Sequence, residues 1–398
     1  MVECWKEKLP VTGRIYMQME EKHMQQPVGY DRRRAAELMK KHDLDMMLVT
    51  SPLNVWYTTG LPMLHSAPNP ILEALSNKFP NFGLIKRDGS VTVFHWIGFM
   101  SVEEFCWADD SVAIFSPDML EDTLGSELED MGLAGCRCGV ESDAPKYLAD
   151  ILSGGGLGLA VRACDELLNE LRLVKSGREI ARLTRAMEIT QTVTEKALGI
   201  LKEGLTDNEL IRFARDEMLR EGADDWNHFT IRFGDSDPEG PGIGRALQAG
   251  EIVRLDFGCV YKGYVSDLNK HAIIGRADGE ARGILENLAK LQAYCAENIK
   301  PGVNMAELGE AACDWYSENV SDGMAYLMGH SIGLQVEDMH LFGSIGGADM
   351  AFEENMVFEI EAWESYGDTQ LGVEDLYVVT KDGCEKLSSL TPEIHEIN

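Results

Sequence analysis

The sequence lacks the features that would place the protein in a membrane or in an oxidising compartment. Its longest apolar stretches have only the length of a strand, so none of them could span a bilayer. The first thirty residues are studded with charge and contain no apolar core, which argues against a signal peptide. The nine cysteines are odd in number, scattered and without a CxxC pair, which predicts reduced thiols in the cytoplasm.

Positive charge is also scarce in this chain. Lys and Arg number 36 against 67 Asp and Glu, which gives a formal net charge of −31. Such a surface repels phosphate backbones, so the composition disfavours nucleic-acid binding. The acidic surface has two explanations, solubility or attraction of a cationic substrate, and the net charge does not decide between them.

The length of 398 residues suits two domains that each bury a core of their own. Strand and helix signals alternate to about residue 165, which predicts a small α/β domain over residues 1–168. Apolar residues at helical spacing over 177–201 follow, and strand-like segments dominate from residue 251 onward. We therefore expect the second domain to cover residues 169–398.

Two strand-like segments in the second domain each carry an aspartate. A tight hairpin with Tyr261 and Lys262 at its turn would place Asp256 opposite Asp267 on one face. Opposed carboxylates repel each other, and unpaired charge inside apolar strands is costly. A positive species must therefore lie between them, either a shared proton or, as the stronger candidate, a divalent cation.

Three further segments supply donors that such a cation needs. His330 lies in MGHSIGLQ, Glu361 in MVFEIEAW and Glu374 in GVEDLYVV, each an ionisable residue among apolar neighbours. Each residue alone is more simply structural, but the five donors together suit a pair of divalent ions of Mn, Fe, Co or Zn. Paired ions can lower the pKa of a bridging water and polarise a substrate carbonyl.

The order of these segments resembles the creatinase/prolidase/methionine-aminopeptidase family. The pattern is D-x10-D, then GH-x-IG, then a strand Glu, then ED-x-x-VV-T-x-DG, and the resemblance covers most of the chain. Residues 54–60 and 173–178 resemble that family's N-terminal-domain and linker motifs. The resemblance implies an α/β (α+β) fold and a homodimer. An N-terminal creatinase-like α/β domain would precede a C-terminal pita-bread domain, whose curved, mainly antiparallel sheet is covered by helices.

The resemblance also implies a role for each donor. Asp256 would chelate one metal, Asp267 and Glu374 would bridge both, and His330 and Glu361 would bind the other. Glu361 would in addition shuttle a proton to the leaving group. The intact set argues against a creatinase proper, which is similar but has lost its metals.

The chain departs from the proline-specific relatives at three substrate-binding positions. Glu239 replaces the histidine of a PHG triplet, Glu337 replaces a second histidine, and Gly372 replaces an arginine. Acids in place of histidines, with a cation lost, would repel a peptide carboxylate and attract a positive charge. Alternatively the alignment is shifted, and His228 or His340 stands in for the missing histidines.

These observations predict a dinuclear metal-dependent hydrolase that cleaves a C–N bond of a small cationic or zwitterionic substrate. One alternative is a lyase similar to the dimethylsulfoniopropionate lyases that share this fold. Another is a genuine Xaa-Pro dipeptidase or aminopeptidase. The last is a non-catalytic binding module, against which the intact ligands argue because such modules usually lose them.

Overall fold

The structure is a computed structural model of the chain, and it divides into two compact units, Met1–Arg172 and Leu173–Asn398. The division falls a few residues beyond the predicted boundary at residue 168. The residues described are 26–61, 81–96, 106–154, 156–235, 242–321 and 323–397. No helix within these ranges is long and apolar enough to cross a membrane.

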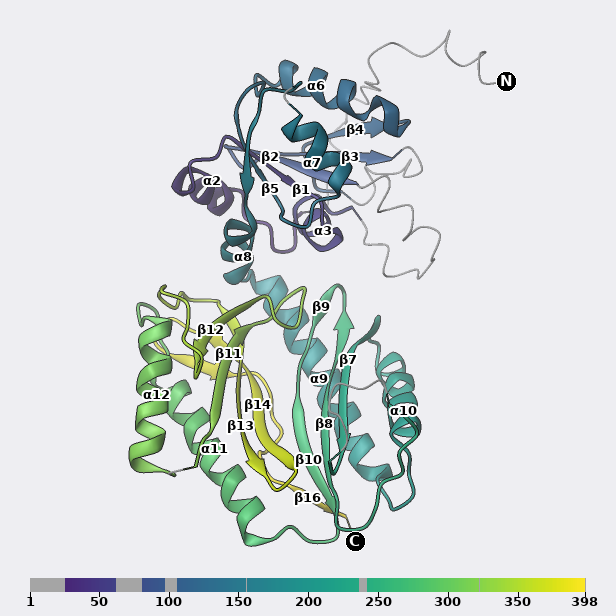
Figure 1. Cartoon of the computed structure of the whole chain (residues 1–398), viewed down its shortest axis with the longest axis vertical. Coiled ribbons are helices and arrows are strands. Elements are labelled where there is room, and N and C mark those ends of the chain that lie inside the picture. The colour runs from purple at the N-terminus through teal and green to yellow at the C-terminus, as the bar shows by residue number, and fades with distance from the viewer. Residues whose placement is uncertain are drawn as a thin grey trace, which may run out of the picture. The chain divides into compact units, whose positions relative to one another are not determined.

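The first unit is built on a six-stranded mixed sheet of order β4-β3-β2-β1-β5-β6 (Figure 1). Its elements are α2 (Arg32–Lys41), β1 (Met46–Val49), α3 (Pro52–Thr59), β2 (Phe82–Lys86), β3 (Val91–Trp96), β4 (Asp110–Ile114), the 3-10 helix η2 (Pro117–Met119), α6 (Leu120–Asp130), β5 (Arg137–Val140), α7 (Lys146–Ser153), β6 (Ala160–Ala163) and α8 (Asp165–Leu173). Strands β1, β2 and β3 pair antiparallel, and the outer pairs are parallel.

A buried acid that follows β5 is hydrogen-bonded to the start of α3 in this unit. The Glu141 carboxylate accepts hydrogen bonds from the backbone N–H of Ser51 at 2.8 Å and from its hydroxyl at 2.6 Å. It also accepts one from the side-chain amide of Asn54. The acid thereby satisfies donors at the start of α3, where helix N–H groups have no intrahelical partner. The Asn54 motif therefore has a structural role in the first unit.

The second unit contains two five-stranded sheets (Figure 1). Its elements are α9 (Gly177–Ile200), α10 (Asp207–Arg220), β7 (Asp225–Phe233), β8 (Ile252–Tyr261), β9 (Tyr264–Val265), β10 (Asn269–Ile274), α11 (Gly279–Asn298), α12 (Met305–Asn319), β11 (Tyr326–Ser331), β12 (Met339–Gly343), β13 (Val357–Tyr366), β14 (Thr369–Val379), β15 (Cys384–Lys386) and β16 (His395–Ile397). One sheet has the order β16-β10-β8-β7, with β9 paired to β8, and the other β12-β11-β13-β14-β15. All pairs except β10–β16 are antiparallel.

Helices cover one face of each sheet through separate apolar clusters. Helices α9 and α10 pack on β7, β8 and β10, whereas α11 and α12 pack on the sheet that contains β13 and β14 (Figure 1). On β13, Phe358 and Ile360 enter the second cluster. Because side chains alternate along a strand, Glu359 and Glu361 lie on the opposite face. The uncovered faces are therefore free to carry the polar residues.

The hairpin that carries both aspartates differs in register from the prediction. Tyr261 pairs with Tyr264, so the turn consists of Lys262 and Gly263, whose φ angles are +50° and +84°. Two positive φ angles are typical of a type I′ turn, and glycine adopts the second without strain. Asp256 consequently pairs with Asn269, and the expectation that it lies opposite Asp267 is wrong.

The observed hairpin register differs from the predicted one by two residues, which leaves the face of each side chain unchanged. Because side chains alternate with a period of two, Asp267 stays on the same face as Asp256. Gly258 permits the approach, since a Cβ added there would lie 1.6 Å from the carbonyl oxygen of Ser266. The segment between β9 and β10 thus lies directly against β8 and brings Asp267 beside the strand of Asp256.

The close contact at Gly258 can be tested by substitution. Gly258→Ala should lower the free energy of unfolding by at least the ~1–3 kcal/mol typical of overpacking, because the clash is with backbone. Gly283→Ala is the control, since Gly283 lies within α11 with no atom near its added Cβ. That change should be neutral or stabilise by about 0.5–1 kcal/mol. Urea unfolding followed by circular dichroism measures both, and equal midpoints for the two variants would contradict the packing described.

Candidate metal centre

The structure brings all five predicted ligands into one cluster. Asp267, His330 and Glu374 offer donor atoms that all lie within 4.8 Å of one another. Asp256, Glu361 and Glu374 form a second such group. Glu374 belongs to both groups, so the two sets of donors adjoin each other. All five residues are buried.

Three neighbouring strands explain why these donors meet. Glu361 on β13 and Glu374 on β14 are direct Cα partners, so both project from the same face of the sheet. Strand β11 pairs with β13 on its other side and places His330 opposite Glu359. The aspartates come from β8 and the segment that follows β9. The cluster therefore draws on both sheets of the second unit.

Burial and mutual repulsion act strongly on the glutamates of this cluster. Burial, followed by the charge of a neighbouring carboxylate, raises the pKa of both Glu361 and Glu374 well above the usual value. Burial would also raise the pKa of Asp256, but Arg254 and His228 lower it to about 2. The pKa values of neighbouring acids in one cluster are thus shifted in opposite directions, and such shifts are common at functional sites.

The donors fit a pair of divalent ions. Oε2 of Glu374 is buried and has no hydrogen-bond partner among the described residues. Nδ1 of His330 lies 3.1 Å from the carbonyl oxygen of Val336, which can only accept a hydrogen bond. Nδ1 therefore carries the proton, and the lone pair of Nε2 is free, 3.6 Å from Glu374 Oε1. This tautomer is the one that a metal-ligating histidine adopts.

Arg254 is a cation at this site that the sequence analysis missed. Its Nη2 atom lies 2.5 Å from Asp256 Oδ2 and 3.6 Å from Glu361 Oε1. The expectation that the site has lost its cation is therefore wrong, although position 372 is indeed glycine. His271, the Cα partner of Arg254, accepts a hydrogen bond from the Gly372 N–H, which places the two positions near each other. The signal was available, because Arg254 precedes Asp256 by two residues and so shares its face.

Glu359 is a second missed residue. It is fully buried, and neither carboxylate oxygen has a hydrogen-bond partner among the described residues. Burial, followed by the charges of Glu374 and Asp267, raises its pKa well above the usual value. The alternating acids of FEIEAW were the available signal, since Glu359 and Glu361 must share a face.

The predicted substrate-binding residues have different outcomes. Glu239 lies outside the described residues. Glu337 is exposed in the loop between β11 and β12, and it belongs to none of the donor groups found among the described residues. His340 faces the following turn, with Nε2 2.8 Å from the carbonyl oxygen of Gly346. Of these four residues, only His228 is seen to enter the cluster.

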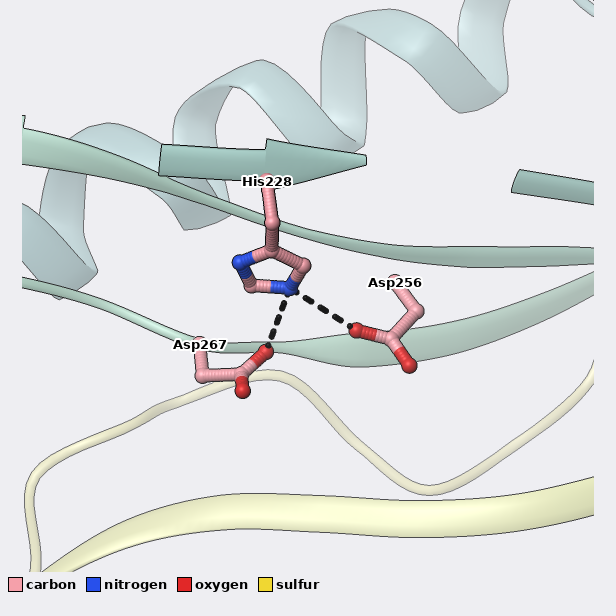
Figure 2. A group of neighbouring side chains, drawn as sticks. All are labelled: His228, Asp256 and Asp267. Atoms are coloured by element: carbon pink, nitrogen blue, oxygen red, sulfur yellow. Dashed lines mark hydrogen bonds and ion pairs between the residues drawn. The ribbon is translucent and has the colours of Figure 1, made fainter. Parts of the chain in front are cut away.

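His228 extends from β7 between the two aspartates (Figure 2). Its Nε2 atom lies 3.2 Å from Asp256 Oδ1 and 3.1 Å from Asp267 Oδ1. Burial lowers the pKa of this imidazole, but the charges and hydrogen bonds of Asp267 and Asp256 outweigh burial and raise it well above the usual value. The three residues form a third group of donor atoms within 4.8 Å of one another.

Comparisons with known proteins agree with this geometry. Residues 181–381 match the family model described as metallopeptidase family M24, and residues 32–174 match the creatinase/prolidase N-terminal domain. An uncharacterized peptidase of Staphylococcus saprophyticus is 26% identical over 367 residues, which covers 88% of this chain and 97% of the relative. An uncharacterized peptidase of Staphylococcus aureus strain RF122 is likewise 26% identical, over 357 residues, with 88% and 96% covered.

Solved structures show the same fold. The prolidase of Pyrococcus horikoshii superposes with a TM-score of 0.74 at 21% identity, covering 90% of this chain and 98% of that one. The Xaa-Pro dipeptidase of Bacillus anthracis gives 0.75 at 19% identity, with 92% and 99% covered. The predicted fold is thus confirmed: a creatinase-like mixed sheet precedes a pita-bread domain of antiparallel sheets and helices.

The crowded glutamates make stability depend on pH once metal is removed. An acid whose folded pKa is raised contributes stability below its unfolded value, 4.5 for glutamate, and that contribution is lost as pH rises through the folded pKa. Chelated protein should therefore lose thermal stability as pH rises above 4.5, the unfolded value of glutamate, whereas metal-loaded protein should lose much less. Asp256, with a pKa lowered to about 2, adds no pH dependence of stability above pH 4.5.

Thermal unfolding midpoints in chelator and in excess metal measure this difference. Glu359→Gln removes one buried acid and should flatten the slope of the chelated protein. Equal slopes with and without metal would show that ions do not hold this cluster together.

Proposed function

Since the chain belongs to metallopeptidase family M24, we propose that it is a dinuclear metal-dependent hydrolase that cleaves a C–N bond of a small zwitterionic or cationic substrate. One observation carries this proposal: Glu374 is common to two groups of buried donor atoms, each within 4.8 Å. A shared carboxylate between adjoining donor groups is what two neighbouring ions require. The proposal excludes a binding module that has lost its ligands.

Five residues would hold the two ions. Asp267, His330 and Glu374 offer one set of donors, and Asp256, Glu361 and Glu374 the other. Carboxylate oxygens with an imidazole nitrogen suit Mn, Fe, Co or Zn. When bound, such ions lower the pKa of a water and polarise the substrate carbonyl.

The chain's own residues complete the reaction. Glu361 is the proposed proton carrier, because a carboxylate at the centre can accept a proton from the attacking water and pass it to the leaving nitrogen. Arg254, which contacts Asp256 and Glu361, is the proposed partner of a substrate carboxylate. The acids Glu337 and Glu239, at positions where proline-specific relatives carry histidines, would favour a substrate that also bears a positive group.

A dipeptidase acting on Xaa-Pro substrates is the second candidate. Arg254 favours it, because a guanidinium at the cluster can bind the carboxylate of a dipeptide. The solved proteins of this fold include a prolidase and an Xaa-Pro dipeptidase.

We further propose that the protein is a homodimer, as the family resemblance implies. We also propose a cytoplasmic location, with which the free cysteines found among the described residues agree.

Removing one shared donor tests the metal centre. Asp267→Asn should reduce the bound ions from two per chain and lower turnover by at least about 100-fold, because the amide keeps the shape but loses the charge. Asp314→Asn makes the same change on the exposed face of α12 and should alter neither quantity. Elemental analysis gives the ion count, and two ions retained by Asp267→Asn would contradict the assignment.

A substrate panel tests the specificity. With Mn-, Fe- and Zn-loaded protein, cationic or zwitterionic amides should be turned over faster than neutral Xaa-Pro dipeptides, because acids near the site attract a cation. Arg254→Met should raise KM for carboxylate-bearing substrates by at least about tenfold, and it should spare the matched methyl esters. Faster turnover of Xaa-Pro dipeptides would favour the second candidate, and an alkene product would indicate a lyase instead.

A further inference from the structure

We propose that His228 is a sixth protein ligand of the metal centre, on the ion that the Asp256 donors would hold, to which Asp267 would contribute as well as to the ion at His330. This inference rests on the proposed two-metal function and deepens it. It replaces the substrate-binding role that the sequence allowed for His228. The argument rests on the position of Nε2, on a bulge in β7 and on the partner of Nδ1.

The position of Nε2 fits a shared ion. Nε2 lies at nearly equal distances from the two carboxylates, 3.2 Å from Asp256 Oδ1 and 3.1 Å from Asp267 Oδ1 (Figure 2). A single N–H proton has one direction, so it cannot be well aligned with two acceptors at once. Neighbouring ligands that each lie about 2.0–2.2 Å from one ion stand about 3.0–3.5 Å apart. Nε2 therefore lies from each of the two carboxylates at the spacing of ligands around a single cation.

A bulge in β7 directs the side chain to this point. The register between β7 and β8 shifts between Trp226 and His228, which leaves Asn227 as the extra residue. Such bulges re-aim side chains next to active sites. The Cα partner of His228 is Gly258, which has no side chain to compete for space beside the imidazole ring. The local sequence thus opens a path from β7 to the aspartates.

The second ring nitrogen of His228 is also held. Its Nδ1 atom lies 3.1 Å from the amide nitrogen Nδ2 of Asn227, which donates to it and leaves the ring proton on Nε2, facing the aspartates. Metal binding at Nε2 requires the Asn227 amide to turn over, so that its oxygen accepts the proton of Nδ1 and the Nε2 lone pair faces the ion. His330 already has this tautomer, with the Val336 carbonyl at Nδ1 and a carboxylate at Nε2. Each histidine thus has a protein partner at Nδ1 that can orient its ring.

This geometry argues against a direct contact between His228 and substrate. Nε2 faces two carboxylates and Nδ1 faces an amide, so both polar atoms of the ring have protein partners. A substrate group would have to displace one of them. A metal ion requires no such change, because it would lie among atoms that already converge.

A nitrogen donor on each ion has a consequence for metal choice. Without His228, the ion at the aspartates would have only oxygen ligands from the protein, a set that suits Mn. An imidazole at this ion favours Fe, Co or Zn, which bind nitrogen donors more tightly than Mn does. Loss of His228 should therefore weaken Zn binding more than Mn binding.

Cobalt-loaded protein allows the coordinated imidazoles to be counted. A histidine bound through Nε2 retains a proton on Nδ1, which gives an exchangeable, paramagnetically shifted proton signal. Wild-type protein with two Co ions should show two such signals. His228→Gln should show one signal, whereas His340→Gln, a control on β12 in the other sheet, should show two.

Calorimetry provides an independent readout. His228→Gln should weaken binding of one Zn ion by at least about 100-fold, because loss of an outer partner alone costs about 10–100-fold. Asn227→Ala removes only the partner of Nδ1 and should cost about 10–100-fold. An equal loss of Zn and Mn affinity in His228→Gln would point to a structural role and count against the proposal.

The proton spectrum of Co-loaded wild-type protein tests whether His228 binds an ion even if a variant fails to fold. Two bound ions with only one imidazole signal would overturn the role of His228 and leave the hydrolase proposal intact. Protein that binds no Co at all would overturn the proposed function itself. Two ions with two signals, one of them lost in His228→Gln, would support both.

Discussion

The second unit depends on one electrostatic constraint, the burial of several acids around a common point. Asp256, Asp267, Glu361 and Glu374 converge there, and Glu359 lies fully buried beside them. Two like charges about 4 Å apart repel by about 4 kcal/mol at the effective dielectric of a protein site. Four or five such acids cannot all stay ionised without positive charge among them. Divalent ions, a guanidinium and an imidazole are the charges that this chain can place there.

The protein supplies two of these positive groups from one sheet. Arg254 contacts Asp256 and Glu361, and His228 lies between Asp256 and Asp267. Both project from the same face, because His228 pairs with Gly258, which lies four residues along β8 from Arg254. The site is therefore not simply acidic, as the substitutions Glu337 and Gly372 had suggested. Its guanidinium can receive an anionic group, which makes a zwitterionic substrate a better match than a purely cationic one.

Packing on the far faces of the sheets fixes this arrangement. Strand β13 shows how, since Phe358 and Ile360 enter the apolar cluster under α11 and α12 while Glu359 and Glu361 face away. The hydrophobic face holds the strand in register, and register in turn sets which acids become neighbours. The cost of crowding charges is thus offset by burial of apolar surface elsewhere in the same strands.

The sequence by itself determined which residues could meet. The alternation in FEIEAW, the Asp256 and Asp267 pair and the glycine-flanked His330 predicted one cluster, because strand periodicity assigns each side chain to a face regardless of distant contacts. The apolar residues at helical spacing over 177–201 likewise predicted a helix, and the structure has α9 over Gly177–Ile200.

Tertiary structure decided what local periodicity does not encode. The turn at Lys262 and Gly263 moved the hairpin register by two residues, because backbone angles and not residue counts select the turn. The bulge at Asn227 directed His228 to the aspartates, and pairing of β8 with β10 placed Arg254 near Gly372. Bulges and strand neighbours depend on contacts between distant segments, which no local pattern in the sequence specifies.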